Sequence, residues 1–245
     1  MSPPSVRLLP WHVAEGPWQM AADEALIETA GAGRASLRFY GWTTATLSLG
    51  YFQPAAIRLA DPLLAALPWL RRLTGGEALV HHHEITYALA LPGGTPWQSS
   101  ETPWPRRMHE IIRMALATLG ITVRLCEEEK RLGEALCFLH QTPGDLLCGP
   151  AKVAGSAQRR PRGALLQHGS LLLAQSEFTP TLPGLHELAG LPLRSADRVM
   201  EAIADAFVRQ TRWKVVSADW TGAERRRVAE LTVSRYQSDN WNAKR

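Results

Sequence analysis

Cysteine is scarce in this sequence, and long hydrophobic runs are missing. Cys126, Cys137 and Cys148 are an odd set of three with no CxxC pair. This pattern excludes a disulfide framework and a zinc knuckle, and free thiols are typical of a reducing compartment. No apolar stretch approaches the ~18 residues of a membrane span, and Met1–Pro10 lacks a basic region followed by an apolar one. We therefore expect a cytoplasmic protein with no membrane segment.

A large excess of charge of either sign is also missing. The formal net charge is +4, which is mildly basic and below the concentrated field of a dedicated nucleic-acid binder. Arginine runs lie at residues 159–162 and 225–227, but few aromatic residues accompany them. We expect no nucleic-acid partner. The first run follows a predicted strand in a loop, where it can meet an acidic protein, because complementary fields speed encounter.

Hydrophobic residues make up 45% of the chain, enough for a substantial core. Helical spacing of apolar residues predicts an amphipathic helix at Gln19–Thr29, a second at Arg106–Leu119 and two more near the end, which Ser195 and a Thr221/Glu224 capping box begin. Alternating or β-forming stretches predict strands at Ser36–Trp42, Thr46–Tyr51, Glu84–Leu91, Ile121–Leu125, Asp145–Cys148, Lys152–Ser156, Ala164–His168 and Ser170–Ala174.

The order of these elements indicates the fold class. Strands mostly follow strands directly, with helices before, between and after them, which favours an α+β fold with a mixed, largely antiparallel sheet flanked by helices. The stretch Pro92–Pro105 reads as a surface loop. Prolines and glycines concentrate in Pro180–Pro192. We therefore expect a main domain at residues 1–190 and a small helical extension at 191–245 that packs on it.

The most informative segment is RRLTGGEALVHHHEIT, residues 71–86. Two arginines precede a Thr-Gly-Gly turn, and a strand follows. Glycines let the backbone approach a ligand closely, and exposed amides there can hold a carboxylate, phosphate or thioester carbonyl. The alternative is a hairpin turn with solvated arginines. The three histidines suggest a metal, but only His81 and His83 can share a strand face, and two ligands without a third make no zinc site. We expect no metal.

A second segment, CGPAKVAGSAQRRPRGALLQHGSLLL, spans residues 148–173. Lys152 opens a short strand that ends in small residues. A lysine that points inward can donate to an acyl carbonyl and stabilise charge that develops in a transition state. The alternative is an ordinary exposed lysine.

Together these segments resemble the lipoate–protein ligase A and octanoyltransferase family, whose superfamily also contains the biotin–protein ligases. The resemblance extends over nearly the whole chain, and several motifs in order make it specific: MAADEAL (20–26), LRFYGWTTATLSLGYFQ (37–53), the RRLTGG turn, KVAGSAQRR with LQHGSLLL, and YQSDNWN (236–242). It implies a biotin/lipoate ligase catalytic-domain-like fold, with a mixed sheet that cradles an acyl chain.

The resemblance also implies site residues, carried over motif by motif. The RRLTGG turn lines the acyl pocket, Lys152 contacts the activated acyl carbonyl, and the small residues after it shape the same pocket. His81 and the His-Gly pair match pocket-lining positions. The substrate-binding candidates are Arg71, Arg72, Thr74, Gly75, Gly76, His81, Gly155, Ser156, Ala157, His168 and Gly169.

The segment ALCFLHQTPGD, residues 135–145, bears on the reaction. One transferase branch of the family carries a Cys-Phe pair shortly before an Asp and the lysine strand, and Cys137, Phe138 and Asp145 match that arrangement. A thiolate can take an acyl group from a thioester and pass it to an amine. The resemblance thus implies an octanoyltransferase that works through a Cys137 acyl-enzyme. Cys148 is a rival nucleophile, and a small buried side chain is the alternative role for Cys137.

Glu77 stands where the family usually has a third glycine, and His82 where it often has Asp. An inward carboxylate there would repel phosphate, which favours the transferase over an ATP-dependent lipoate–protein ligase. The transferase needs no cofactor, whereas the ligase would need ATP and Mg. A non-catalytic acyl-binding relative is the second alternative. Expected partners are acyl carrier protein as donor and, as acceptor, a lipoyl-domain or glycine-cleavage-H-type protein.

Overall fold

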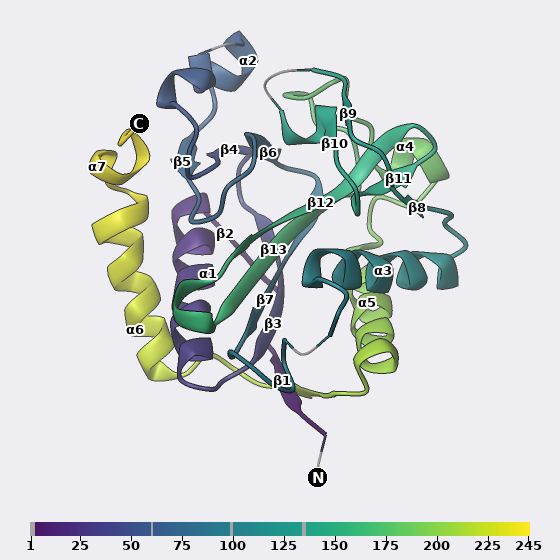
Figure 1. Ribbon diagram of the computed structural model, residues 1–245. Helices are drawn as coiled ribbons and strands as arrows, with labels where there is room; N and C mark the ends of the chain where they lie inside the picture. Colours follow the sequence, from purple (N-terminus) through teal and green to yellow (C-terminus); the bar gives the residue numbers. More distant parts are fainter. Residues whose placement is uncertain (1–2, 60, 99, 134–135) are drawn as a thin grey trace.

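The computed structural model describes residues 3–59, 61–98, 100–133 and 136–245. In this part of the chain a nine-stranded mixed sheet forms the centre of the molecule (Figure 1). Its order is β14-β1-β3-β7-β13-β12-β11-β8, with β2 beside β3. The strands are β1 (Ser5–Leu8), β2 (His12–Ala14), β3 (Ser36–Trp42), β7 (Glu84–Leu91), β8 (Arg124–Leu125), β11 (Leu146–Cys148), β12 (Ala151–Arg159), β13 (Leu165–Leu172) and β14 (Lys214–Ser217).

The strand β7 shows why the sheet is covered on both faces. All eight of its residues are buried. Alternate side chains, Ile85 and Tyr87 among them, join one hydrophobic cluster, while Ala88 and Ala90 join another. Since successive side chains of a strand point to opposite faces, the two clusters are two separate layers of core.

Helices cover the two faces. On one side lie α3 (Trp104–Thr118) and α5 (Ala196–Thr211), and on the other α1 (Gly16–Gly31) and α6 (Gly222–Leu231) (Figure 1). Shorter turns complete the chain: α2 (Pro62–Ala65), α4 (Leu185–Ala189), α7 (Asp239–Asn242), η1 (Ala55–Leu59), η2 (Cys137–Leu139), η3 (Pro161–Gly163) and η4 (Thr232–Tyr236). The α+β fold with a largely antiparallel sheet is therefore confirmed.

The helix α1 differs from its expected amphipathic character. Its residues from Gln19 to Ile27 are all buried, because α6 and η4 cover the side that faces away from the sheet. Two buried carboxylates, Asp23 and Glu24, are therefore paired: Asp23 accepts a hydrogen bond from Tyr40, and Glu24 accepts one from Tyr236. A buried carboxylate without such partners would be costly.

A smaller three-stranded sheet lies against the main one and carries the Thr-Gly-Gly turn. Its order is β5-β4-β6, with β4 (Thr46–Leu49), β5 (Trp69–Arg71) and β6 (Leu79–His81). The turn therefore connects β5 to β6. A further pair, β9 (Lys130–Arg131) with β10 (His140–Gln141), belongs to residues 126–145, here called the cysteine segment, of which residues 134 and 135 lie outside the described part.

Residues 191–245 contribute more than helices. The strand β14, which follows α5 and precedes α6 along the chain, pairs in parallel with β1 at the edge of the main sheet. No strand was predicted from the sequence in residues 191–245. The division of the chain at residue 190 stays a prediction.

The strand β13 differs from the expected pair of strands. It runs without interruption from Leu165 to Leu172, and Gly169 pairs within it rather than ending it. The capping box of Thr221 and Glu224 is present as expected. None of the described helices is long and apolar enough to cross a membrane. The cytoplasmic location stays a prediction.

Candidate active site

A cavity lies between the two sheets, with the cysteine segment at its border. Its walls enclose about 490 Å³ of space that no atom fills, part of it open to solvent, and only about 60 Å³ of this admits a water-sized molecule, so the cavity is narrow. Apolar groups from Met20, Leu79 and Phe138 form part of its wall. The full lining is Met20, Tyr40, Arg72, Gly76, Leu79, His81, Thr86, Cys137, Phe138, Gly155, Ser156, Ala157, His168, Gly169 and Ser170.

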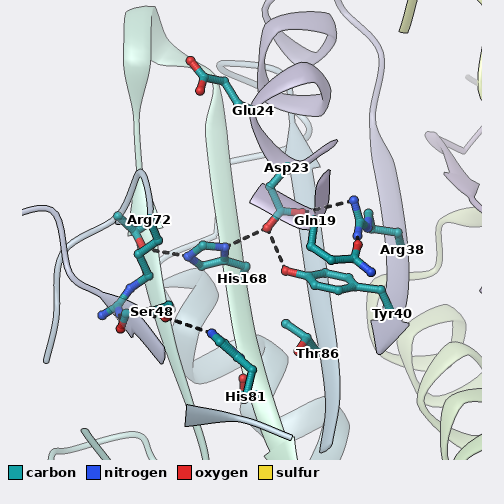
Figure 2. Close-up of polar contacts among 12 residues, drawn as sticks. Gln19, Asp23, Glu24, Arg38, Tyr40, Ser48, Arg72, His81, Thr86 and His168 are labelled. Atoms are coloured by element: carbon teal, nitrogen blue, oxygen red, sulfur yellow. Dashed lines mark hydrogen bonds and ion pairs between the residues drawn. The ribbon is translucent and has the colours of Figure 1, made fainter. Parts of the chain in front are cut away.

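His168 connects the two sheets across the cavity. Its Nδ1 lies 2.8 Å from Asp23 Oδ2, and its Nε2 lies 2.6 Å from Thr74 Oγ1. A neutral ring fits both contacts when Nδ1 donates to the carboxylate and Nε2 accepts from the hydroxyl. Figure 2 shows His168 between Asp23 and the turn, with Tyr40 on the same carboxylate. The main sheet thereby fixes the position of the turn.

His81 forms a second chain of the same kind. Its Nδ1 lies 2.7 Å from Glu84 Oε1. Its Nε2 lies 2.9 Å from Ser48 Oγ, a contact that Figure 2 draws as a dashed line. Burial lowers the pKa of His81, and Glu84 opposes this shift. Trp42 stacks on the ring, with centroids 3.9 Å apart. His81 is thus a neutral, fixed part of the cavity wall that joins β4 to the start of β7.

Arg72 stabilises the conformation of the Thr-Gly-Gly turn by hydrogen bonds to backbone oxygens. Its guanidinium donates to the backbone oxygens of Ser48, Gly75 and Glu77 at 2.6–3.1 Å. Burial lowers its pKa to about 10, and the Cys137 thiol opposes that shift. At neutral pH Arg72 therefore remains a cation whose charge is felt at Cys137.

Arg71 points the other way. Its guanidinium donates to the backbone oxygens of Gly50, Tyr51 and Gln53, and its Nε donates to the Asn242 oxygen. It thus ties the turn to α7 and does not line the cavity. Neighbouring residues of a strand point to opposite faces, and this explains why two adjacent arginines have different surroundings.

Two glycines allow β12 and β13 to lie close to their neighbours. A Cβ on Gly169 would lie 2.6 Å from the Gly155 oxygen, and one on Gly155 would lie 2.7 Å from Cε of Lys152. Any larger side chain at Gly169 would therefore push the two strands apart. A methyl group on Gly155 would instead displace Lys152.

Cys137 stands at the start of η2 and lines the cavity. Its backbone N–H donates to the Ala78 oxygen at 2.8 Å, which holds the cysteine segment against the end of the turn. Its Sγ lies 3.8 Å from Nζ of Lys152. A nearby cation favours the thiolate, which is the nucleophilic form of cysteine.

Lys152 is buried, and Nζ is fully occupied. It lies 2.7 Å from Asp145 Oδ2, 2.9 Å from the His140 oxygen and 3.2 Å from the Cys137 oxygen. These three acceptors match the three protons of an ammonium group. Lys152 is therefore a fixed cation behind Cys137 that also anchors the cysteine segment to β12.

The other two cysteines have different surroundings. Cys148 is 6% exposed and belongs to the hydrophobic core. Burial raises the pKa of its thiol, which disfavours the reactive thiolate. Cys126 is buried and its thiol contacts the Glu128 oxygen. Neither cysteine lines the cavity.

Glu77 turns away from the cavity. Its Oε1 lies 2.7 Å from the Arg131 guanidinium and 3.5 Å from Nδ1 of His140. Both partners belong to the cysteine segment. The carboxylate that departs from the family pattern thus connects the turn to the segment that carries Cys137.

The structure brings together most of the residues that the sequence singled out. Nine of them line the cavity: Arg72, Gly76, His81, Cys137, Gly155, Ser156, Ala157, His168 and Gly169. The other four do not line the cavity. The hydroxyl of Thr74 is hydrogen-bonded to His168, and the carbonyl of Gly75 accepts from Arg72. Nζ of Lys152 contacts the Cys137 thiol, and Arg71 contacts α7.

Two carboxylates were not predicted from the sequence: Asp23, which is hydrogen-bonded to His168, and Glu84, which is hydrogen-bonded to His81. Their signal was a charged residue inside an apolar run, at Asp23 within α1 and at Glu84 at the start of β7. Also not predicted were the lining residues Met20, Tyr40, Leu79, Thr86 and Ser170. Among the residues that the structure describes, no group of three or more histidine, cysteine, aspartate or glutamate side chains could hold a metal ion.

Fold and site together indicate a protein that holds an acyl chain. A partly apolar cavity between two sheets, with a thiol and a fixed ammonium group at its border, suits an acyl chain held next to a reactive cysteine. Comparison with known proteins agrees. The family model of the lipoyl protein ligase A/B catalytic domain matches residues 15–189.

The chain belongs to the lipoyl protein ligase A/B catalytic domain family. It is 32% identical to the octanoyltransferase LipM of Kyrpidia tusciae, over 96% of this chain and 97% of that protein. It is 34% identical to the octanoyltransferase LipM of Exiguobacterium sibiricum, over 92% and 94%.

Solved structures share the fold. A lipoate-protein ligase A bound with ATP has a TM-score of 0.77 at 21% identity and covers 99% of both chains. A bipartite lipoate protein ligase from Thermoplasma acidophilum has a TM-score of 0.72 at 18% identity, with 99% of this chain and 97% of that one covered.

Proposed function

We propose that this protein is an octanoyltransferase of lipoate metabolism, which moves an octanoyl group from a carrier thioester to a lipoyl-domain lysine through a Cys137 acyl-enzyme. The octanoyltransferases named above, similar over nearly their whole length, support the activity. One observation carries the mechanism: Cys137 lines the partly apolar cavity, and its thiol lies 3.8 Å from Nζ of Lys152.

The first step is a thioester exchange. The Cys137 thiolate attacks the carbonyl carbon of the donor thioester and a new C–S bond forms. The bond between that carbon and the carrier sulfur then breaks, and the carrier leaves as a thiolate that takes a proton from water. Both ends of the exchange are thioesters, so little free energy is gained or lost.

The second step forms the amide. The neutral amine of the acceptor lysine attacks the carbonyl carbon of the Cys137 thioester, the C–S bond breaks, and the amine proton passes to solvent. The Cys137 thiolate is thereby regenerated beside Lys152. Because one thiol serves both steps, donor and acceptor use the same cavity in turn.

The role of Lys152 in this scheme follows from its contacts. All three Nζ protons already have acceptors in Asp145, His140 and Cys137. Donation to an acyl carbonyl would break one of these contacts. Its geometry supports stabilisation of the Cys137 thiolate, whereas the direct contact with the acyl carbonyl stays a prediction.

The transferase reaction uses no nucleotide or metal ion, whereas the ligase alternative needs ATP and Mg. The likeness to the ATP-bound ligase is a likeness of fold at 21% identity and does not separate the two reactions. The position of Cys137 at the cavity favours the transferase, because a ligase that makes an acyl-adenylate has no use for a thiol nucleophile.

Intact-protein mass spectrometry tests the proposal. The protein is incubated with octanoyl-acyl carrier protein in the absence of ATP, as wild type, Cys137→Ser and Cys148→Ser. We expect one added octanoyl group in the wild type and in Cys148→Ser. An adduct on Cys137→Ser, or turnover only after addition of ATP and free lipoate, would refute the cysteine mechanism. No adduct and no turnover under either condition would leave the non-catalytic acyl-binding protein.

A further inference from the structure

A group of cations surrounds two aromatic rings, the half-buried Tyr51 and the exposed Phe52, on the outer side of the Thr-Gly-Gly turn. It consists of Tyr51, Phe52, Arg159, Lys244 and Arg245, here called the cationic surface. Nζ of Lys244 lies 3.5 Å from the centre of the Tyr51 ring, and the Arg159 guanidinium lies 5.0 Å from it. The Arg245 guanidinium lies 5.4 Å from the centre of the Phe52 ring. Cation–π contacts hold these charges in place.

The positive charge of this surface is uncompensated within the described part of the chain. Arg159, Lys244 and Arg245 form none of the ion pairs found there, whereas Arg7, Arg225, Arg227 and Arg235 each pair with a carboxylate. The neighbouring groups respond to the field. Burial together with Arg71 and Arg245 lowers the pKa of Lys244. A hydrogen bond from Lys244 and the charges of Lys244, Arg159 and Arg245 lower the pKa of the half-buried Tyr51 phenol.

The cationic surface adjoins the cavity through two direct connections. The Arg159 guanidinium donates to the Leu73 oxygen at 2.9 Å, and Tyr51 N–H donates to the Thr74 oxygen at 2.8 Å. A Cβ on Gly75 would lie 3.6 Å from the Phe52 ring. The next residue along, Gly76, lines the cavity and is exposed. The cationic surface and the exposed edge of the cavity at Gly76 therefore belong to the same turn.

Phe52 gives the surface an apolar centre. Its side chain is 68% exposed, the second-highest value among the large hydrophobic residues of the described chain. An exposed aromatic ring among cations is typical of a protein-docking surface, where aromatic and arginine side chains carry much of the binding energy. A small anion alone would not use the ring.

We propose that the cationic surface docks the acidic carrier protein that donates the acyl chain, and this rests on the proposed function. A carrier brings its thioester on an arm that contains a phosphodiester, so negative charge accompanies the chain to the cavity. The acceptor instead brings a lysine, and an ammonium group gains nothing from nearby uncompensated cations. Opposite charge on the two surfaces would mainly raise the rate of encounter.

A pair of charge-reversal variants tests this docking. The test variant is Lys244→Glu with Arg245→Glu. The matched control is Arg198→Glu with Arg209→Glu, two exposed arginines of α5, on the opposite side of the main sheet (Figure 1). Each variant replaces two positive charges by two negative ones, so the net charge falls from +4 to 0 in both. The difference between them therefore reports the position of the charge.

The rate of Cys137 acylation is measured with octanoyl-acyl carrier protein and with octanoyl-pantetheine, a thioester without phosphate or protein. With the carrier, we expect the test variant to lose about tenfold or more in the second-order rate constant at low salt, and less at high salt. With octanoyl-pantetheine we expect both variants to stay within about twofold of wild type. Lys244→Ala with Arg245→Ala should show a smaller loss in the same direction.

Each other outcome overturns the docking proposal. Equal losses in test and control variants would show a general charge effect, and an equal loss with octanoyl-pantetheine would show damage to the cavity. A loss confined to transfer from acylated Cys137 to a lipoyl domain would assign the surface to the acceptor. A loss with octanoyl-phosphopantetheine as large as that with the carrier would show that the surface reads the phosphate and not the protein. Failure of every donor to acylate the wild type would instead refute the proposed function.

Discussion

The floor of the cavity and the cysteine segment are built in different ways. The floor consists of β7 and β13, which pair over eight consecutive positions and are buried throughout. The cysteine segment contains two strands of two residues each. It is held to the rest by polar contacts with Lys152, Glu77 and the carbonyl of Ala78, and by Phe138, which packs in a small hydrophobic cluster with Leu172 and Leu182. The floor of the cavity is thus positioned by a sheet, whereas Cys137 is positioned by a few polar contacts and one small hydrophobic cluster.

This difference has a physical consequence. A long antiparallel pair with packed layers on both faces resists local opening, whereas a segment with few buried apolar contacts opens at a lower free-energy cost. Substitutions in the floor should therefore reduce the free energy of unfolding, and substitutions in the segment should reduce the acylation rate. The following four experiments test that distinction.

Lys152 lies on β12 and anchors the cysteine segment, so its loss should change both stability and acylation and have the largest effect. Lys152→Met leaves Asp145 buried without its cation, which typically costs about 3–5 kcal/mol of unfolding free energy. It also removes the charge 3.8 Å from the sulfur, and we expect at least a ~100-fold slower acylation. Urea unfolding and single-turnover acylation measure the two effects.

A second substitution separates the effect of Lys152 on stability from its effect on acylation. Lys152→Met combined with Asp145→Asn removes the uncompensated charge, so part of the lost stability should return while acylation stays slow. Recovery of the rate in the double variant would show that Lys152 acts only through stability.

Gly169→Ala tests the floor alone. The new methyl group would lie 2.6 Å from a backbone oxygen of the neighbouring strand, and such overpacking typically costs about 1–3 kcal/mol. The matched control is Gly31→Ala, where no atom lies within 4 Å of the added Cβ. Equal urea midpoints for the two variants would show that the floor adapts more easily than its pairing suggests.

The wall of the cavity that the smaller sheet forms should also respond to pH, through His81 of β6. Its folded-state pKa lies below the ordinary 6.5 because of burial, so the unfolded chain binds the proton more readily. Stability is therefore complete above the unfolded pKa and falls as the pH drops below about 6.5, by no more than about 1.4 kcal/mol per pH unit for one proton. His81→Gln should reduce the slope of unfolding free energy against pH between 7.5 and 5.5. An unchanged slope would show that other titrating groups cause the pH dependence of stability.

The smallest effect is expected at Glu77, in the contact between the turn and the cysteine segment. The partner Arg131 is 51% exposed, so Glu77→Gln should cost less than about 1 kcal/mol of stability. We expect acylation to slow by about two- to fivefold, because Cys137 is held less firmly. The control Glu110→Gln breaks a similarly exposed ion pair on α3 and should leave the rate unchanged. Equal rates in the two variants would remove the positioning role of Glu77.

Parts of the fold were readable in the sequence because local forces decide them. The strands Ser36–Trp42 and Glu84–Leu91 lie where apolar and β-forming residues indicated them, and the Thr221/Glu224 box begins its helix. The interruption expected at Gly169 was wrong, because the neighbouring strands pair with β13 on both sides and outweigh the weak β preference of glycine. The strand β14 was missed, because its pairing with β1 joins residues more than 200 positions apart.

The sequence by itself determined the chemical groups: free thiols, a lysine among small residues, a glycine turn and a slight excess of positive charge. The tertiary structure decided which of these groups meet. It placed Arg72 inside the turn and Arg71 outside it, gave His168 a carboxylate 145 positions away, and surrounded the turn with cations from the end of the chain. Local preference extends over a few residues, whereas hydrogen bonds and charges act through space, so these encounters exist only in the folded molecule.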